Sequence, residues 1–424
     1  MKRVALFLII LISSALSQIQ FEDYFLEKTM RVDYYHVGDV NSKIIALDEI
    51  REEPYWGGPK KNLIDRFNFG NFKYEVYDLK TNQLIFSRGY STLFAEWLTT
   101  PEAKKVRRAF HETVVFPFPK NPVKLIIYTR DEKNVFQKSF ELEIDPKNPF
   151  IKKDKPFNFS SFKILNNGNS NDKVDIVVIP DGYTESEKEK YKKDLQSFVN
   201  LLFNSSPYKE NKSNFNIWGV EAYSKESGTD IPRDNIWKET ILNTSFYTFD
   251  TERYLMTEDN KTLRSIAANV PYDLIYILVN TPKYGGGAIY NYYSVAVADH
   301  PTFEYLIVHE FGHGFAGLGD EYYTSQVSYE EFYKLNVEPW ERNLTTLVDF
   351  DSKWKNLIDQ DTPIPTPPTD EYKNRVGVFE GGGYVPKGVY RPMLDCTMKS
   401  RTVDNFCVVC KNTIQEVINF YCEK

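Results

Sequence analysis

The segment His309-Glu310-Phe311-Gly312-His313 constrains the chain more than any other feature of its sequence. Histidines four residues apart project from the same face of a helix, so both imidazoles can reach one cation. Glu310 lies about 100° further around the helix, where it can reach a metal-bound water without binding the metal. A core helix with incidental histidines is disfavoured, because burying these polar groups unpaired would be costly. The segment predicts a helix that holds one catalytic zinc ion through His309 and His313.

A catalytic zinc ion has three protein ligands and keeps one position for water. After the helix, Gly317 and Gly319 can take positive φ and turn the chain back toward the metal. Asp320 and Glu321 follow directly. We favour Asp320 as the third ligand because a short carboxylate just past a glycine turn gives tighter geometry. Glu321 and a more distant glutamate remain alternatives, and the acid that does not bind can orient a ligand.

The first 17 residues are typical of a secretory signal peptide. Lys2 and Arg3 precede an apolar run from Val4 to Ile12, and small residues lead to Ser17. The run is too short for a membrane helix, which needs about 20 apolar residues, and no later stretch is long and apolar enough to span a bilayer. The sequence predicts cleavage near Ser17 and a secreted, periplasmic or cell-surface protein. A net charge of -7 without a long Lys/Arg run argues against nucleic acid as a partner.

Two patterns divide the remaining chain. Residues 18–150 alternate apolar and polar positions between short polar turns, which predicts an antiparallel β-sandwich. Residues 151–424 combine apolar strands with amphipathic helices, which predicts an α/β layer and an α+β chain overall. The strands are expected at 174–179, 215–220, 274–279 and 293–298, with a capping box of Thr184 and Glu187 before a helix. Gly285-Gly286-Gly287 is interpreted as a flexible break.

The run HEFGHGFAGLGDEYY, residues 309–323, resembles the metal motif of the IgA-peptidase family of secreted bacterial zinc metallopeptidases. Residues 179–184, and the stretch from 380 to 398, resemble two further blocks of that family. The resemblance covers most of 160–424 and implies a zinc endopeptidase with a metzincin-like fold behind an all-β domain. Ordinary metzincins have the Gly and the third ligand one residue earlier, where this chain has Ala316 and Gly319. Met398 is either the methionine turn of such folds or an ordinary core residue.

Four cysteines lie near the C-terminal end: Cys396, Cys407, Cys410 and Cys422. In an oxidising compartment they can form two disulfides with three connectivities. Disulfides that pin the tail are favoured over a four-thiolate zinc site and over reduced, buried thiols. The triplet Asn343-Leu344-Thr345 fits a glycosylation sequon, which is a weak signal.

Together these features predict an exported zinc endopeptidase that acts on protein or peptide, with Glu310 as general base. The family resemblance makes immunoglobulin one candidate substrate. The strand at 293–298 is predicted to be a sheet edge that pairs with the substrate by β-augmentation.

The alternative function is that of a surface or periplasmic glycan- or protein-binding module with a structural or inactive zinc site. Glu310 discriminates between them, because a structural site is closed by a fourth protein ligand and needs no base. A zinc amidase acting on cell-wall peptide differs only in substrate.

Overall fold

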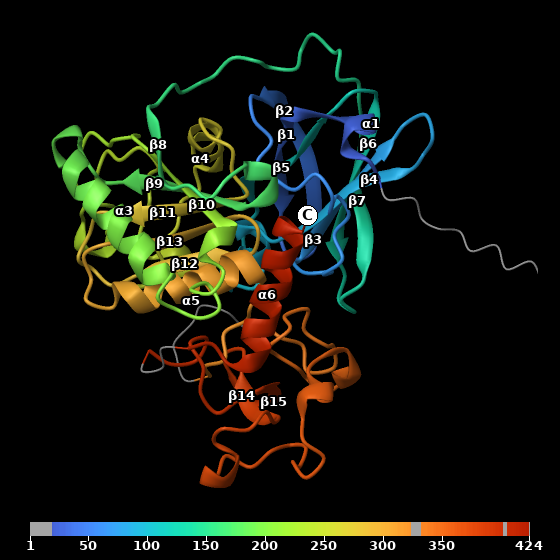
Figure 1. Ribbon diagram of the computed structural model, residues 1–424, viewed down its shortest axis with the longest axis vertical. Coiled ribbons are helices and arrows are strands. Elements are labelled where there is room, and N and C mark those ends of the chain that lie inside the picture. The colour runs from blue at the N-terminus through green and yellow to red at the C-terminus, as the bar shows by residue number, and fades with distance from the viewer. Residues whose placement is uncertain (1–18, 324–331, 402–404, 424) are drawn as a thin grey trace, which may run out of the picture.

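We analysed a computed structural model of the chain, which describes residues 19–323, 332–401 and 405–423 (Figure 1). The predicted signal peptide lies outside the described residues. The N-terminal region forms two antiparallel sheets, ordered β2-β1-β5 and β4-β3-β6-β7. The strands are β1 (Phe25–Gly38), β2 (Lys43–Glu53), β3 (Phe72–Asp78), β4 (Leu84–Tyr90), β5 (Arg108–Pro119), β6 (Val123–Arg130) and β7 (Phe136–Ile144), and two short helices are α1 (Phe21–Tyr24) and α2 (Leu93–Trp97).

The two N-terminal sheets share one apolar core. Val32 and Tyr34 of β1 lie in the same buried cluster as Tyr74 and Val76 of β3. Along β3 the buried positions alternate with half-buried ones, as expected for strands that present one face to a core. This β-rich region confirms the predicted N-terminal architecture.

A six-stranded sheet forms the centre of the second region, in the order β12-β13-β11-β9-β10-β8. The inner strands β13, β11, β9 and β10 run parallel, and β12 and β8 are antiparallel edges. Every residue of β9 is buried, which explains its apolar run from Ile176 to Ile179. The bounds are β8 (Ser161–Leu165), β9 (Val174–Asp181), β10 (Phe215–Val220), β11 (Leu274–Val279), β12 (Gly286–Ile289) and β13 (Tyr293–Val297).

Two sequence predictions about this sheet are wrong. The strand at 293–298 is β13, which lies between β12 and β11 and is not an edge. The glycine-rich segment interpreted as a flexible break instead supplies the first two residues of β12, the edge strand. The other expected strands are confirmed within one or two residues, as is the capping box of Thr184 and Glu187.

Helices pack against this sheet and join the two regions (Figure 1). Helix α3 (Lys188–Leu202) contacts α5 (Phe303–Ala316), and α4 (Asn260–Ala267) contacts both β9 and the N-terminal β5. Helix α6 (Val408–Cys422) packs on α5 and β9, and near its end the Phe420 carbonyl accepts a hydrogen bond from Asn62. A hairpin of β14 (Phe379–Gly382) and β15 (Val385–Arg391) precedes α6.

No helix among the described residues has the length and apolar character required to cross a bilayer. Strand β7 ends at Ile144 and β8 begins at Ser161, so the segment predicted as a domain boundary carries neither a strand nor an α-helix. The division into 18–150 and 151–424 stays a prediction.

Candidate metal centre

Helix α5 presents the two histidines of the motif side by side. Its apolar residues, including Ile307 and Phe311, are buried, and the helix ends where Gly317 takes a left-handed conformation at φ 60°. On the opposite side of the same turns, His309 Nε2 and His313 Nε2 lie 3.2 Å apart. The four-residue spacing therefore brings the two imidazoles together, as the sequence predicts.

The turn after α5 brings Asp320 back to the histidines. Its Oδ1 lies 3.2 Å from His309 Nε2 and 3.2 Å from His313 Nε2, so the three atoms form a nearly equilateral triangle. Ligand atoms about 2.05 Å from a tetrahedral ion are separated by about 3.3 Å. The triangle thus has the dimensions of three ligands around one zinc-sized ion.

Hydrogen bonds to the far side of each imidazole orient the ring. His313 Nδ1 lies 2.5 Å from the Leu318 carbonyl oxygen, and His309 Nδ1 lies 3.1 Å from the Thr397 carbonyl oxygen. Since a carbonyl only accepts, Nδ1 carries the proton and Nε2 presents a lone pair. Asp320 Oδ1 is buried and has no hydrogen-bond partner among the described residues. Three ligand atoms that face one point fit a bound cation.

The electrostatics of the centre agree with this geometry. Burial opposes the charge of His313, yet the Asp320 carboxylate raises the pKa of His313 to about 9. Burial also opposes the charge of Asp320, but the histidines hold its pKa well below its usual range. In the metal-free chain a proton is thus attracted to the place that a cation would occupy, and metal binding would release it.

Glu310 lies beside this triangle and faces the edge strand. It is almost fully buried, and burial raises the pKa of its carboxyl group. A Cβ atom built on Gly286 of β12 would lie 3.5 Å from Glu310 Oε1, so the carboxylate sits close to the strand backbone. A cleft of about 480 Å³ opens here; β12, Glu310 and both histidines line it.

Residues distant in sequence complete the centre. Tyr384, in the turn of the β14–β15 hairpin, donates a hydrogen bond from Oη to Asp320 Oδ2 (2.5 Å), and the backbone N–H of Gly383 donates to the Asp320 carbonyl (2.8 Å). Arg253 lines the cleft and donates to Tyr322 Oη (3.1 Å). Neither Arg253 nor the role of Tyr384 carries a local sequence signal, because both depend on long-range packing.

Glu321 does not join the histidines. Its side chain instead lies beside Asn343, whose side-chain amide donates to Glu321 Oε1 (2.9 Å). Asn343 also makes paired hydrogen bonds with the backbone of Gly319 and is fully buried, so in the folded chain the sequon of Asn343 is closed to glycosylation. The structure thus groups His309, His313 and Asp320 and separates Glu321 from them.

Comparison with known proteins identifies the family. The family model described as IgA peptidase M64 matches residues 162–375 and 368–418, and the one described as peptidase M64 N-terminus matches residues 20–141. No curated protein matches the chain. The two matched models correspond to the α/β region with the metal centre and to the N-terminal sheets. The chain therefore belongs to the IgA peptidase M64 family, and it is a metallopeptidase.

Proposed function

We propose that the chain is an exported zinc endopeptidase that cleaves peptide bonds within proteins. The ligands are His309, His313 and Asp320, and Glu310 is the general base. The observation that supports this best is the triangle of ligand atoms, 3.2 Å on each side, at the wall of the cleft next to a buried carboxylate. Among the described residues three protein ligands face this point, which leaves a position for water, as in catalytic rather than structural zinc sites.

The side chains of the site divide the chemistry between them. When bound, zinc lowers the pKa of a coordinated water toward neutrality and polarises the substrate carbonyl. Glu310 takes a proton from the attacking water and passes it to the leaving amine. Its burial, which raises its pKa, makes the carboxyl group a better proton acceptor and keeps it a usable donor near neutral pH. Tyr384 holds Asp320 in place through Oδ2.

An extended substrate would pair with β12. On the outer side of this strand Gly286 already exchanges hydrogen bonds with Arg253 and Leu255. The next outward-facing backbone groups are those of Ala288, which is half-buried, lines the cleft and has no outer backbone partner among the described residues. Strand addition at Ala288 would present a peptide bond to Glu310. Ala288→Pro removes the N–H and should raise KM, whereas Ala288→Ser keeps it and should not.

The direct test is hydrolysis of casein and of immunoglobulin by the purified chain. We expect cleavage of casein at internal bonds, its loss with a chelator, and its return when zinc is added back. The immunoglobulin arm tests the substrate that the family description suggests. A chain that retains its zinc and leaves casein, immunoglobulin and a mixed peptide library intact would contradict the proposal and favour a binding module.

Export is tested separately. The predicted signal peptide, residues 1–17, implies a mature chain that begins at Gln18. N-terminal sequencing of the protein recovered outside the cytoplasm should begin at this residue. Recovery of the intact chain from the cytoplasm alone would contradict export and leave the peptidase proposal unchanged.

A further inference from the structure

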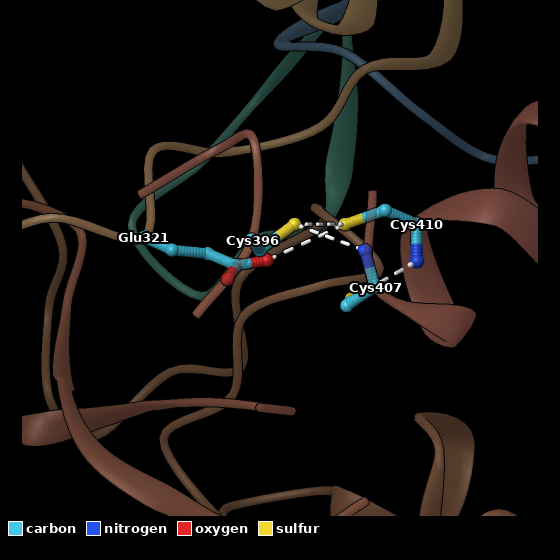
Figure 2. A group of neighbouring side chains, drawn as sticks. All are labelled: Glu321, Cys396, Cys407 and Cys410. Atoms are coloured by element: carbon cyan, nitrogen blue, oxygen red, sulfur yellow. Dashed lines mark hydrogen bonds between the residues drawn. The ribbon is translucent and has the colours of Figure 1, made fainter. Parts of the chain in front are cut away.

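A second cluster of metal-ligand side chains lies on the other side of the Asp320–Glu321 peptide. It consists of Glu321, Cys396, Cys407 and Cys410, all buried, and one ligand atom from each lies within 4.8 Å of the others (Figure 2). The residues come from the turn after α5, the segment before α6 and the first turn of α6. Cys407 and Cys410 form a C-x-x-C pair at the start of this helix.

The spacing of the ligand atoms fits a tetrahedral ion. Cys396 Sγ and Cys410 Sγ lie 3.8 Å apart, and Cys410 Sγ lies 3.3 Å from Glu321 Oε1. Sulfur atoms about 2.3 Å from a tetrahedral zinc ion are separated by about 3.8 Å, and a sulfur and an oxygen by about 3.5 Å. By contrast, a disulfide needs the two sulfurs at about 2.05 Å. All four cysteines of the chain are free thiols in the structure.

The carboxylate in this cluster lacks a partner. Glu321 Oε1 accepts hydrogen bonds from Asn343 and Cys410, whereas Oε2, although buried, has no hydrogen-bond partner in the described part of the chain. A buried carboxylate oxygen without a donor is unfavourable by about 1–3 kcal/mol or more. Two backbone N–H groups already donate to sulfur, from Cys407 to Cys396 Sγ (3.2 Å) and from Cys410 to Cys407 Sγ (3.5 Å). Such donors stabilise thiolates.

We propose that Glu321, Cys396, Cys407 and Cys410 bind a second zinc ion in a closed, structural site. Three thiolates select a borderline-soft ion such as zinc over the hard cations magnesium and calcium. Four protein ligands leave no position for water, so this site supplies no catalysis. Arg391 and Lys399 lie near enough to Glu321 to offset part of the negative charge that the four ligands retain around a divalent ion.

The proposed structural site adjoins the centre formed by His309, His313 and Asp320, so an ion bound there would help to position that centre. Glu321 follows Asp320, and its N–H donates to the Met398 carbonyl (2.9 Å). Cys396 is next to Thr397, whose carbonyl oxygen orients His309. An ion bound by Glu321 and Cys396 would therefore hold both Asp320 and Thr397 in position, and Met398 beneath Gly312 of α5. This inference goes beyond the proposed peptidase activity, and it can hold or fail independently of it.

Zinc content of the full mature chain tests the proposal. We expect two zinc ions per chain in the wild type, one in His309→Ala/His313→Ala and one in Cys407→Ser/Cys410→Ser. Cys422→Ser is the matched control, because Cys422 lies outside the cluster and contacts the Asn214 carbonyl (3.4 Å), and it should retain two. A wild-type chain that binds two zinc ions and hydrolyses no peptide would contradict only the proposed function.

Two further measurements do not depend on the folding of a cysteine variant. X-ray absorption at the zinc edge of His309→Ala/His313→Ala should report sulfur neighbours at about 2.3 Å. Titration of wild-type thiols in denaturant with chelator, without reductant, should count four. One zinc ion in the wild type with only nitrogen and oxygen neighbours, or a count of two thiols that reveals a disulfide, would overturn the second site.

Discussion

Two pairs of buried carboxylates, one pair in each region of the molecule, have different surroundings. In the N-terminal sheets, Asp33 receives a bidentate ion pair from Arg31 at 2.8 and 2.7 Å, and both side chains are buried. Glu49 is surrounded by Arg51, Lys152 and Lys261. In the peptidase region, Asp320 and Glu321 are equally buried, yet each has one oxygen without a hydrogen-bond partner among the described residues.

This difference distinguishes carboxylates that are paired with the chain's own cations from those that we propose bind an ion. An acid paired with the chain's own cations has its charge offset within the protein, and removing one partner is strongly destabilising. An acid whose lone pair faces other lone pairs is unfavourable until a cation arrives, and its removal affects the ion more than the fold. The contrast between Asp33 and Asp320 can therefore be tested by mutation.

The largest effect is expected at the general base. Glu310→Gln should lower kcat by about 10²–10⁴-fold, because the amide cannot accept the proton of the attacking water. Zinc content should not change, since Glu310 is not a ligand. The matched control is Glu304→Gln, an exposed position in the first turn of the same helix, which should retain full activity. An active Glu310→Gln enzyme would contradict the assignment.

Two variants test the contrast between Asp320 and Asp33. Asp320→Asn should weaken zinc binding at the histidines by at least about 100-fold. Above about pH 9, where His313 is neutral and no longer pairs with Asp320, the metal-free chain should keep its melting temperature. Asp33→Asn should leave zinc affinity unchanged but lower the free energy of unfolding by about 3–5 kcal/mol, because Arg31 loses its closest charged partner. Calorimetry of the metal-free chains and zinc titration separate the two outcomes. Equal destabilisation by both substitutions would break the distinction.

The hydrogen bond to Asp320 should have a smaller effect. Tyr384→Phe removes the donor to Asp320 Oδ2 and should reduce zinc affinity or kcat/KM by about 10–100-fold, the range for groups that orient a ligand. Tyr390→Phe is the control, because Tyr390 lies on the same hairpin without lining the cleft. Equal losses in the two variants would indicate a general effect on the hairpin.

Local patterns predict helix α5, the pairing of its two histidines and its end. The spacing of His309 and His313 and the turn at Gly317 depend on neighbours within a few residues, so periodicity and glycine stereochemistry describe them fully. The same holds for the buried strands β10 and β11, whose apolar runs match their bounds. These features need no knowledge of the rest of the chain.

Such local patterns do not predict contacts between segments that are distant in the sequence. Asp320 and Glu321 are adjacent and chemically alike, and only Tyr384 and Asn343, which come later in the chain, decide where each side chain points. The sequence pattern does not reveal the edge strand β12, because its glycines lack side chains and so show no alternation of apolar and polar residues. The cysteines suggested disulfides because their carboxylate partner, Glu321, lies far away in sequence.

The smallest expected effect concerns the internally paired acid Glu49. Burial alone would raise its pKa, but hydrogen bonds from Lys152, Arg51 and Lys261 lower the pKa from 4.5 to about 2. A lowered folded-state pKa means that the pairing stabilises the fold above about pH 4.5 and that this stability is lost as the pH falls toward 2.

Glu49→Gln should therefore reduce the free energy of unfolding by about 2 kcal/mol at pH 7. This value is below the one that the full pKa shift implies, because Lys152 is half-exposed. Denaturant titrations at pH 7 and pH 3 should show the difference shrinking, whereas Glu141→Gln, which removes an exposed pair with Lys138, should stay within about 0.5 kcal/mol at both. A deficit for Glu49→Gln that does not depend on pH would mean that packing, and not charge pairing, makes this acid part of the fold.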